Sequence, residues 1–366
     1  MPRPRVPRFV AGHRFLAASS VVVGATVAGG IVRRLVGVPE GAEEAEPKDL
    51  PDGERRILRG PAGTRVYTER FPGREDALLF THGWCLNESV WLHQKRRFGR
   101  GPLSVVTWDL PGHGRSSLPR RGDVSLGLLV DAMARVVDQA VDERGRVVLV
   151  GHSLGGVLTL RYLLDHPETA RRKVRGMVLL STPVMQIARS LAGGWPGSAA
   201  ESWLLGTAMH LVVGSRGMDR LMGWEAGRPR NDAISYHIVR AGFGDDPSPA
   251  DVRLVRDAIA SVPRQVRLQT FRAMSDFDVS RSLAALDVPA LVGFGTKDRL
   301  VNPADTRALA LGLPNAKALE FTGAGHAAFL ERTRDFDDSL AAFARARLRA
   351  RRRTAGPGGA GGKAHR

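Results

Sequence analysis

A single serine stands between two glycines where an apolar run ends, in the segment RVVLVGHSLGG at residues 146–156. A serine hydroxyl becomes a nucleophile when it is exposed at a fixed angle and hydrogen-bonded to a base. A sharp turn from a buried strand into a helix presents a side chain in this way, but it crowds the positions two before and two after. Gly151 and Gly155 occupy those positions, so the sequence predicts Ser153 as a nucleophile at a strand-to-helix turn. The start of the helix would also direct backbone N–H groups at developing negative charge.

A nucleophilic serine needs a histidine as general base and an acid that orients the histidine. Asp298 ends a predicted strand in GFGTKD, and His326 lies in GAGH after the last predicted strand. We therefore expect Ser153, Asp298 and His326 to form a catalytic triad, in the chain order serine, acid, histidine. Asp276 and Asp278 are reserve candidates for the acid.

Five other residues near these segments are interpreted as structural. His82 in THGW lies on the wrong loop for a general base and is expected to shape that loop. His113 and His152 are expected to be loop or packing residues, and Asp109 precedes the serine, which argues against a role as the acid. Cys85 is the sole cysteine, and nothing beside it resembles an activating base, so we expect a small buried apolar residue.

The elements that must position these residues are short apolar runs alternating with helical patterns. Six runs look like strands that each end in a loop: residues 77–83, 103–112, 146–153, 174–183, 288–298 and 317–326. Continuous valine and leucine runs are typical of strands buried on both faces of a parallel sheet. The segments RRILRG and TRVYTERF indicate an antiparallel start, and residues 125–143 and 155–166 look helical. The alternation predicts an α/β fold with right-handed crossovers.

The alternation stops between residues 184 and 277, where helix-like apolar patterns replace the strands. Helices inserted near the loop ends of a sheet would form a lid over the predicted site. The large side chains of this interval either pack the lid or line a substrate pocket. They are Trp195, Trp203, Trp224, Met209, Met218 and Met222.

Five motifs together resemble the signature segments of the α/β-hydrolase superfamily, in the family's order: THGW, DLPGHGRS, GHSLGG, GTKDRLVNP and GAGH. The resemblance covers about residues 55–348. It implies an α/β-hydrolase fold with a mostly parallel eight-stranded sheet flanked by helices, a helical cap insertion, and cofactor-free hydrolysis of esters or related substrates. It also implies that the backbone N–H groups of Trp84 and Leu154 form the oxyanion hole.

The residues around the serine narrow the reaction. Epoxide and haloalkane hydrolases of this fold use an aspartate at the turn, so Ser153 argues against both classes. Proline-releasing peptidases have a tryptophan after the serine, where this chain has Leu154. We therefore expect hydrolysis of carboxylic esters, of apolar or lipid-like acyl groups, through an acyl-enzyme on Ser153. The alternatives are an acyltransferase or thioesterase with the same triad, a haloperoxidase-like esterase suggested by HGWCLNESVW, and a non-catalytic ligand-binding protein. No cofactor and no metal site are expected.

The net charge of +17 is concentrated at the two ends of the 366-residue chain. Residues 1–34 hold six basic residues and residues 345–366 hold eight, and neither segment holds an acidic one. The nearly balanced middle argues against a nucleic-acid-binding face. No nucleic acid is therefore expected among the partners.

The uncharged stretch at residues 15–32 follows four arginines and is predicted to be a membrane anchor. A cleaved signal peptide and a buried or surface helix are the alternatives. The flanking charge places the catalytic body outside the cytoplasm; a secreted protein, or a cytoplasmic membrane-associated one, remains the alternative.

The expected division of the chain is 1–54 (basic N-terminus, anchor or signal, acidic linker), 55–183 and 278–348 (hydrolase core), 184–277 (helical cap) and 349–366 (disordered basic tail).

Overall fold

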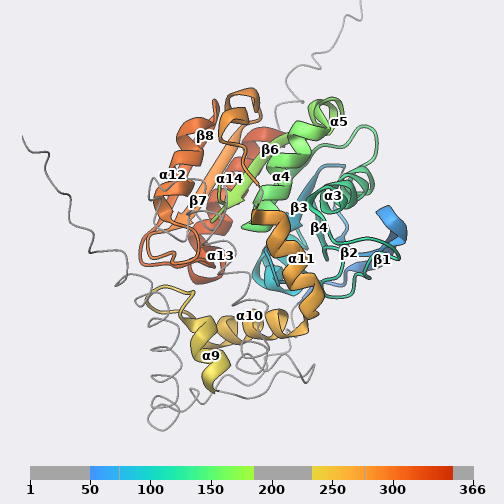
Figure 1. Ribbon diagram of the computed structural model, residues 1–366. Helices are drawn as coiled ribbons and strands as arrows, with labels where there is room; N and C mark the ends of the chain where they lie inside the picture. The colour runs from blue at the N-terminus through green and yellow to red at the C-terminus, as the bar shows by residue number, and fades with distance from the viewer. Residues whose placement is uncertain (1–49, 74, 185–232, 276, 349–366) are drawn as a thin grey trace, which may run out of the picture.

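The computed structural model describes residues 50–73, 75–184, 233–275 and 277–348 (Figure 1). Eight strands form one sheet in the order β1-β2-β4-β3-β5-β6-β7-β8. Strands β1 and β2 join the sheet antiparallel, and the strands from β4 to β8 pair in parallel. The strands are β1 (Glu54–Arg59), β2 (Arg65–Phe71), β3 (Ala77–Thr81), β4 (Ser104–Trp108), β5 (Val147–His152), β6 (Val174–Leu180), β7 (Ala290–Gly295) and β8 (Ala316–Phe321).

The sheet is flanked by helices, so the predicted fold class and the predicted antiparallel start are confirmed. Short 3-10 helices are η1 (Pro61–Gly63), η2 (Glu88–Trp91) and η4 (Ser280–Ala285). The α-helices of the core are α2 (Leu92–Phe98), α3 (Leu126–Ala140), α4 (Leu154–Asp165), α5 (Pro167–Lys173), α12 (Pro303–Gly312), α13 (Ala328–Glu331) and α14 (Thr333–Leu348). Those of the interval between β6 and β7 are α9 (Ala233–Arg240), α10 (Pro249–Ser261) and α11 (Arg264–Ser275).

The core consists of two apolar layers, one on each face of the sheet. Successive side chains of a strand point to opposite faces, so Leu79 and Leu149 pack with α3, α4 and α12. Val148 and Val150 pack on the other face with α2, α13 and α14. Strands buried on both faces must be apolar throughout, which explains why their sequences are continuous rather than alternating.

Strand register brings the loops that carry the candidate residues to one edge of the sheet. Thr81 of β3 is the partner of Gly151 of β5, and Gly151 is the partner of Leu179 of β6. Parallel neighbours in register end at the same edge, so the loops after β3, β5 and β6 emerge side by side. Ligands of open α/β sheets bind at this carboxyl edge.

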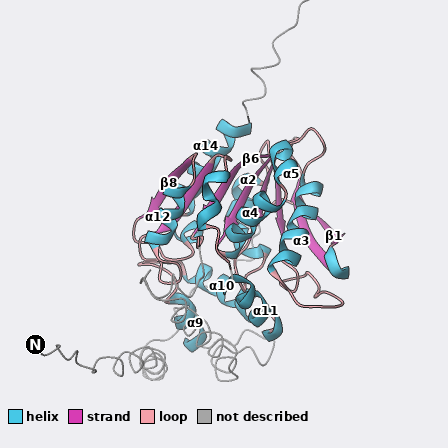
Figure 2. Ribbon diagram, turned by 45° about the horizontal axis from the view of Figure 1, so that its top comes forward, coloured by secondary structure: helices cyan, strands magenta, loops and turns pink. Residues whose placement is uncertain are grey.

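The described part of the interval between β6 and β7 is helical. Helices α9, α10 and α11 lie together beyond one edge of the sheet (Figures 1 and 2). The predicted boundaries at residues 184 and 277, and the role of this interval as a lid, stay predictions. The tryptophans and methionines named above, at residues 195–224, lie outside the described residues.

Residues 1–49 and 349–366, at the two ends of the chain, also lie outside the described residues. The anchor predicted at residues 15–32 belongs to the first of these segments and stays a prediction. Within the described ranges, no helix has both the length and the apolar character needed to cross a membrane.

Candidate active site

Ser153 forms the sharp turn between β5 and α4, with a φ of 51° and a ψ of −113°. Positive φ is uncommon for a residue with a side chain, and strain of this kind accumulates at functional sites. A Cβ on Gly151 would lie 2.4 Å from the Gly155 carbonyl oxygen, and a Cβ on Gly155 would lie 2.2 Å from the Thr81 carbonyl oxygen. Backbone atoms cannot rotate away from such contacts, so the predicted need for glycine at both positions is confirmed.

His326 and Asp298 form a hydrogen-bonded pair in the loops after β8 and β7. His326 Nδ1 donates to Asp298 Oδ2 at 2.9 Å, and Asp298 Oδ1 accepts from the N–H groups of Leu300 at 2.8 Å and Val301 at 2.9 Å. Burial opposes ionisation of Asp298, but His326 and the two backbone N–H groups outweigh it and hold the pKa of this carboxyl below its ordinary value. A carboxylate on Nδ1 orients the ring and leaves Nε2 to take up a proton.

The histidine loop lies against the serine turn. His152, the residue before Ser153, has its Nε2 atom 3.0 Å from the His326 carbonyl oxygen, and the two imidazole rings are 4.8 Å apart between centroids. The hydrogen bonds among the described residues do not include one between the Ser153 hydroxyl and His326. Such a bond often forms only when substrate is in place. The structure thus brings Asp298 and His326 together beside the serine turn, and the complete triad stays a prediction.

Both predicted oxyanion donors border the same turn. Leu154 is the first residue of α4, so its N–H has no carbonyl partner within the helix. Trp84 follows Gly83, where a Cβ would lie 2.8 Å from His152 Nδ1, which places the loop after β3 directly against the turn. Within the described residues, neither N–H donates a hydrogen bond to the protein. The role of both groups as oxyanion donors stays a prediction.

The other histidines of the site are buried and neutral. His82 Nε2 accepts from the N–H of Leu110 at 3.0 Å, so its Nδ1 carries the proton and donates to the Gly83 carbonyl oxygen at 2.8 Å. Burial lowers the pKa of His82 well below its ordinary value, that of His113 to about 4 and that of His152 to about 3. None of the three is arranged as the partner of a carboxylate, unlike His326.

The carboxylates of Asp109 and Asp278 accept hydrogen bonds from backbone N–H groups and not from a histidine. Asp109 accepts from the N–H groups of Glu88 and Arg115, each at 2.8 Å, and so ties two loops together. Exposed Asp278 accepts from the backbone N–H of Ser280 at 2.9 Å. The other reserve candidate for the acid, residue 276, lies outside the described residues.

Cys85 is buried and packs against Val262 and Val266. Burial raises the pKa of its thiol, so the thiolate needed for nucleophilic attack does not form near neutral pH. Its φ of 57° shows that it serves as a turn residue in the loop after Trp84.

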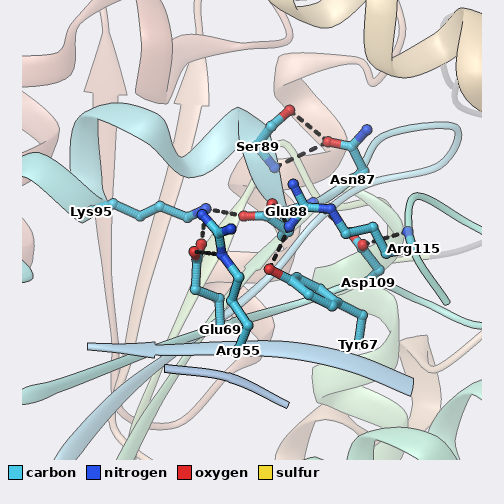
Figure 3. Close-up of polar contacts among 9 residues, drawn as sticks. All are labelled: Arg55, Tyr67, Glu69, Asn87, Glu88, Ser89, Lys95, Asp109 and Arg115. Carbon is cyan, nitrogen blue, oxygen red and sulfur yellow. Dashed lines mark hydrogen bonds and ion pairs between the residues drawn. The ribbon is translucent and has the colours of Figure 1, made fainter. Parts of the chain in front are cut away.

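Sequence reasoning missed a buried ionic cluster behind this loop (Figure 3). The Lys95 ammonium donates to Glu69 Oε2 at 2.7 Å and also to Glu88, and Arg115 lies 3.7 Å from Glu88. Asp109 receives the Glu88 N–H, so the cluster is linked to the loop that carries Trp84. The available signal was Glu69, a charged residue inside the strand pattern VYTERF that a partner must neutralise.

Among the residues that the structure describes, no three histidine, cysteine or acidic side chains are grouped as metal ligands would be.

Comparison with curated proteins gives relatives of several kinds. The chain is 25% identical over 282 residues to a pimeloyl-[acyl-carrier protein] methyl ester esterase of Aeromonas hydrophila, covering 76% of this chain and 98% of that protein. It is 30% identical over 368 residues to the polyketide synthase ThaQ of Burkholderia thailandensis, covering 94% of this chain. It spans only 15% of that synthase.

Solved structures show the same fold at low sequence identity. The esterase EaEST from Exiguobacterium antarcticum superposes with a TM-score of 0.64 at 19% identity, covering 79% of this chain and 99% of that one. A bromoperoxidase from Bacillus anthracis gives the same TM-score, identity and coverage. The model of the alpha/beta hydrolase family matches residues 78–343, which include the serine turn, the acid loop and the histidine loop. On this match, and on the sheet that carries those three loops, the chain belongs to the alpha/beta hydrolase family.

Proposed function

We propose that this protein hydrolyses carboxylic esters through an acyl-enzyme on Ser153. The observation that carries the proposal is the Asp298–His326 pair packed against a serine held at positive φ. Family membership and esterase relatives support a hydrolase. The residues themselves support the finer assignment of a serine-dependent ester hydrolase.

In the acylation step His326 Nε2 takes the proton of the Ser153 hydroxyl as Oγ bonds to the ester carbonyl carbon. The carbonyl oxygen becomes an oxyanion, which the N–H groups of Trp84 and Leu154 stabilise by hydrogen bonds. When the intermediate collapses, the ester C–O bond breaks and His326 gives its proton to the leaving alcohol. Asp298 remains ionised and stabilises the imidazolium throughout.

Deacylation repeats the sequence with water as the nucleophile. His326 takes a proton from water as the hydroxide oxygen bonds to the acyl carbon, and the same two N–H groups hold the second oxyanion. Breakdown releases the acid, returns the proton to Oγ and regenerates the serine. No cofactor or metal enters either step.

The substitution Ser153→Ala tests the proposal, because it removes the nucleophile and leaves an alanine that packs in the same turn. We expect turnover of a p-nitrophenyl ester to fall by roughly 10⁵-fold or more, with little change in thermal stability. Mass spectrometry of the fluorophosphonate-labelled wild-type protein should find the label on Ser153.

Ser181→Ala is the matched control, since Ser181 is also buried at positive φ after the neighbouring strand. We expect it to retain both turnover and labelling. Ester hydrolysis by the Ser153→Ala protein, or a label on another residue, would show that the nucleophile is wrong. Absence of any label on the folded wild type would favour the non-catalytic alternative.

A second candidate, hydrolysis of an acyl group presented on a carrier, is favoured by the relatives. Matches to methyl ester esterases named for a pimeloyl-[acyl-carrier protein] cover 96–98% of those proteins. Parallel assays with a methyl ester and a thioester of the same acyl chain distinguish an esterase from a thioesterase. An added alcohol that takes up the acyl group would instead identify an acyltransferase.

The proposed acyl group is apolar. The partly exposed Trp84, whose backbone N–H is the proposed oxyanion donor, packs its ring 5.6 Å from that of buried Phe271, and an aromatic surface beside the donor suits an apolar chain better than a charged one. A series of p-nitrophenyl esters of increasing acyl length tests this preference: kcat/KM should rise with acyl chain length.

Membrane attachment through residues 15–32 would place the enzyme near such substrates. Fractionation of cells expressing the full chain tests this attachment.

A further inference from the structure

The carboxylate of Glu331, at the end of α13, joins the histidine loop to the segment between α9 and α10. Its Oε1 atom accepts from the Gly325 N–H at 2.8 Å, and its Oε2 atom accepts from the Gly244 N–H at 2.6 Å. Gly325 directly precedes His326, the proposed general base. The Glu331 side chain therefore fixes two backbone N–H groups: one next to the proposed base, and one in the interval between β6 and β7.

These two segments also run backbone against backbone. The His326 N–H donates to the Gly242 carbonyl oxygen, and the Asp245 N–H donates to the Gly323 carbonyl oxygen, both at 2.9 Å. A Cβ on Gly244 would lie 1.9 Å from the Gly323 oxygen, so no larger residue fits at this approach. At such short range a shift of one segment must move the other.

The two N–H groups need an acceptor with two free oxygens, and a carboxylate supplies both. Burial raises the pKa of Glu331, while the hydrogen bonds from Gly244 and Gly325 and the nearby charges of Arg332 and Arg240 favour the ionised form. A glutamine has the same shape but only one acceptor oxygen. Its amide nitrogen would meet an N–H donor with another donor, which breaks one of the two bonds.

We propose that Glu331 is a positioning residue for His326, acting through the backbone of Gly325. The inference rests on the proposed function, because His326 matters only as the base that serves Ser153. Asp298 fixes the orientation of the ring, and Glu331 fixes the position of the loop from which the ring projects. Because the same carboxylate holds Gly244, the position of the base also depends on the segment that follows α9.

The substitution Glu331→Gln tests the proposal by its effect on kcat. Displacement of a base by a fraction of an ångström should lower kcat on the order of tenfold to a hundredfold. KM should change by less than about twofold, because ground-state binding does not use the base. The rate of fluorophosphonate labelling at Ser153 should fall with kcat, while the thermal midpoint stays near that of the wild type. Glu331→Asp, with two oxygens on a shorter chain, should restore part of the loss.

Asp245→Asn is the matched control. Asp245 lies in the same segment between α9 and α10, but its exposed ion pair is with Lys297 of the loop after β7 and makes no carboxylate bridge to the backbone of the histidine loop. We expect this variant to keep kcat within about twofold of the wild type, as for other exposed pairs. If Glu331→Gln retains wild-type kcat, or raises KM instead of lowering kcat, the proposal is overturned.

Hydrogen exchange separates failure of this inference from failure of the proposed function. In Glu331→Gln, the amides of residues 323–326 and 242–245 should exchange faster than in the wild type, whether or not the protein cleaves esters. Unchanged protection at both segments would overturn the positioning role, even if turnover had fallen. Absence of esterase activity in the wild type would overturn the proposed function and leave the exchange result to be judged by itself.

Discussion

The Asp298 carboxylate accepts three hydrogen bonds, from His326 and from the N–H groups of Leu300 and Val301. All three donors are brought to it by folding, so the ionised carboxylate is tied to the folded state. Its pKa in the folded protein therefore lies below the ordinary value of 3.8. A depressed pKa of this kind means that ionisation of Asp298 stabilises the fold.

The substitution Asp298→Asn should lower ester turnover by roughly 10⁴-fold, because the imidazole loses the group that sets its tautomer. It should also remove a pH-dependent part of the stability. Above pH 4 the carboxylate contributes fully, and its contribution is lost as the pH falls through the lowered pKa of the folded state. Urea unfolding of both proteins between pH 2 and pH 7 should show a stability gap that closes at the acid end.

Asp278→Asn is the control for this measurement, since Asp278 is exposed and bonds only its own turn. It should leave turnover unchanged. A gap between wild type and Asp298→Asn that stays constant down to the acid limit would contradict the linkage between Asp298 and folding.

Local motifs made part of the site predictable at this scale. The glycines around Ser153 follow from the crowding of one turn, which involves only neighbours in the chain and the strand beside them. The positions of Asp298 and His326 followed from strand ends and chain order. Glu331 carried no such signal, because its partners Gly244 and Gly325 are ordinary loop glycines whose approach depends on tertiary packing.

At the scale of elements, helix α11 is joined to the loop that carries the proposed oxyanion donor. The Trp84 indole N–H donates to the Arg267 carbonyl oxygen at 3.1 Å, and its ring packs against Phe271. Cys85, the next residue, packs against Val262, which precedes this helix, and against Val266 in its first turn. The backbone N–H of Trp84 is therefore held between β3 and a helix that follows it by more than 180 residues in the chain.

Trp84→Phe keeps an aromatic ring against α11 but removes the indole donor. We expect kcat to fall by on the order of tenfold, because the loop loses the bond that fixes its distance from the helix. Loss of one hydrogen bond costs about 1 kcal/mol, so the thermal midpoint should fall by only a few degrees. Steady-state kinetics and thermal melting measure the two effects.

Trp108→Phe is the matched control, since the Trp108 indole donates at 3.0 Å to Thr81 Oγ1 inside the sheet and not to a group of α11. It should cost more stability, because Trp108 is fully buried and the smaller ring leaves a cavity, but it should lower kcat less. An equal loss of kcat in both variants would show that the effect of Trp84→Phe is general and not due to the contact with α11.

The strands were predictable from the sequence because burial on both faces requires continuous apolar runs, as in Val147–His152 and Ala290–Gly295. The spatial order of the strands and the contact between α11 and the Trp84 loop were not predictable from periodicity. They depend on which distant segments pack together, and a helical pattern such as Arg264–Ser275 does not specify its partner.

At the scale of the whole molecule, the proposed chemistry lies at one edge of the sheet, and α14 supports the sheet from one face. Phe336, Leu340 and Ala344 of α14 are buried in the second apolar layer, and the helix ends at Leu348. The basic residues that follow carry much of the net charge but are separated in sequence from every residue of the proposed mechanism. We therefore expect the basic residues after Leu348 to be removable without loss of catalysis.

A chain that stops after Leu348 should keep the kcat, KM and thermal midpoint of the full protein, although it loses six basic residues. A chain that stops after residue 339 loses Leu340 and Ala344 from the core; burying one leucine contributes about 2–5 kcal/mol, so this chain should melt at a clearly lower temperature. Kinetic assays and melting curves on the two truncations, side by side, make the comparison. If the first truncation loses activity while it keeps its melting temperature, the basic C-terminal residues take part in turnover, and the separation of charge from catalysis does not hold.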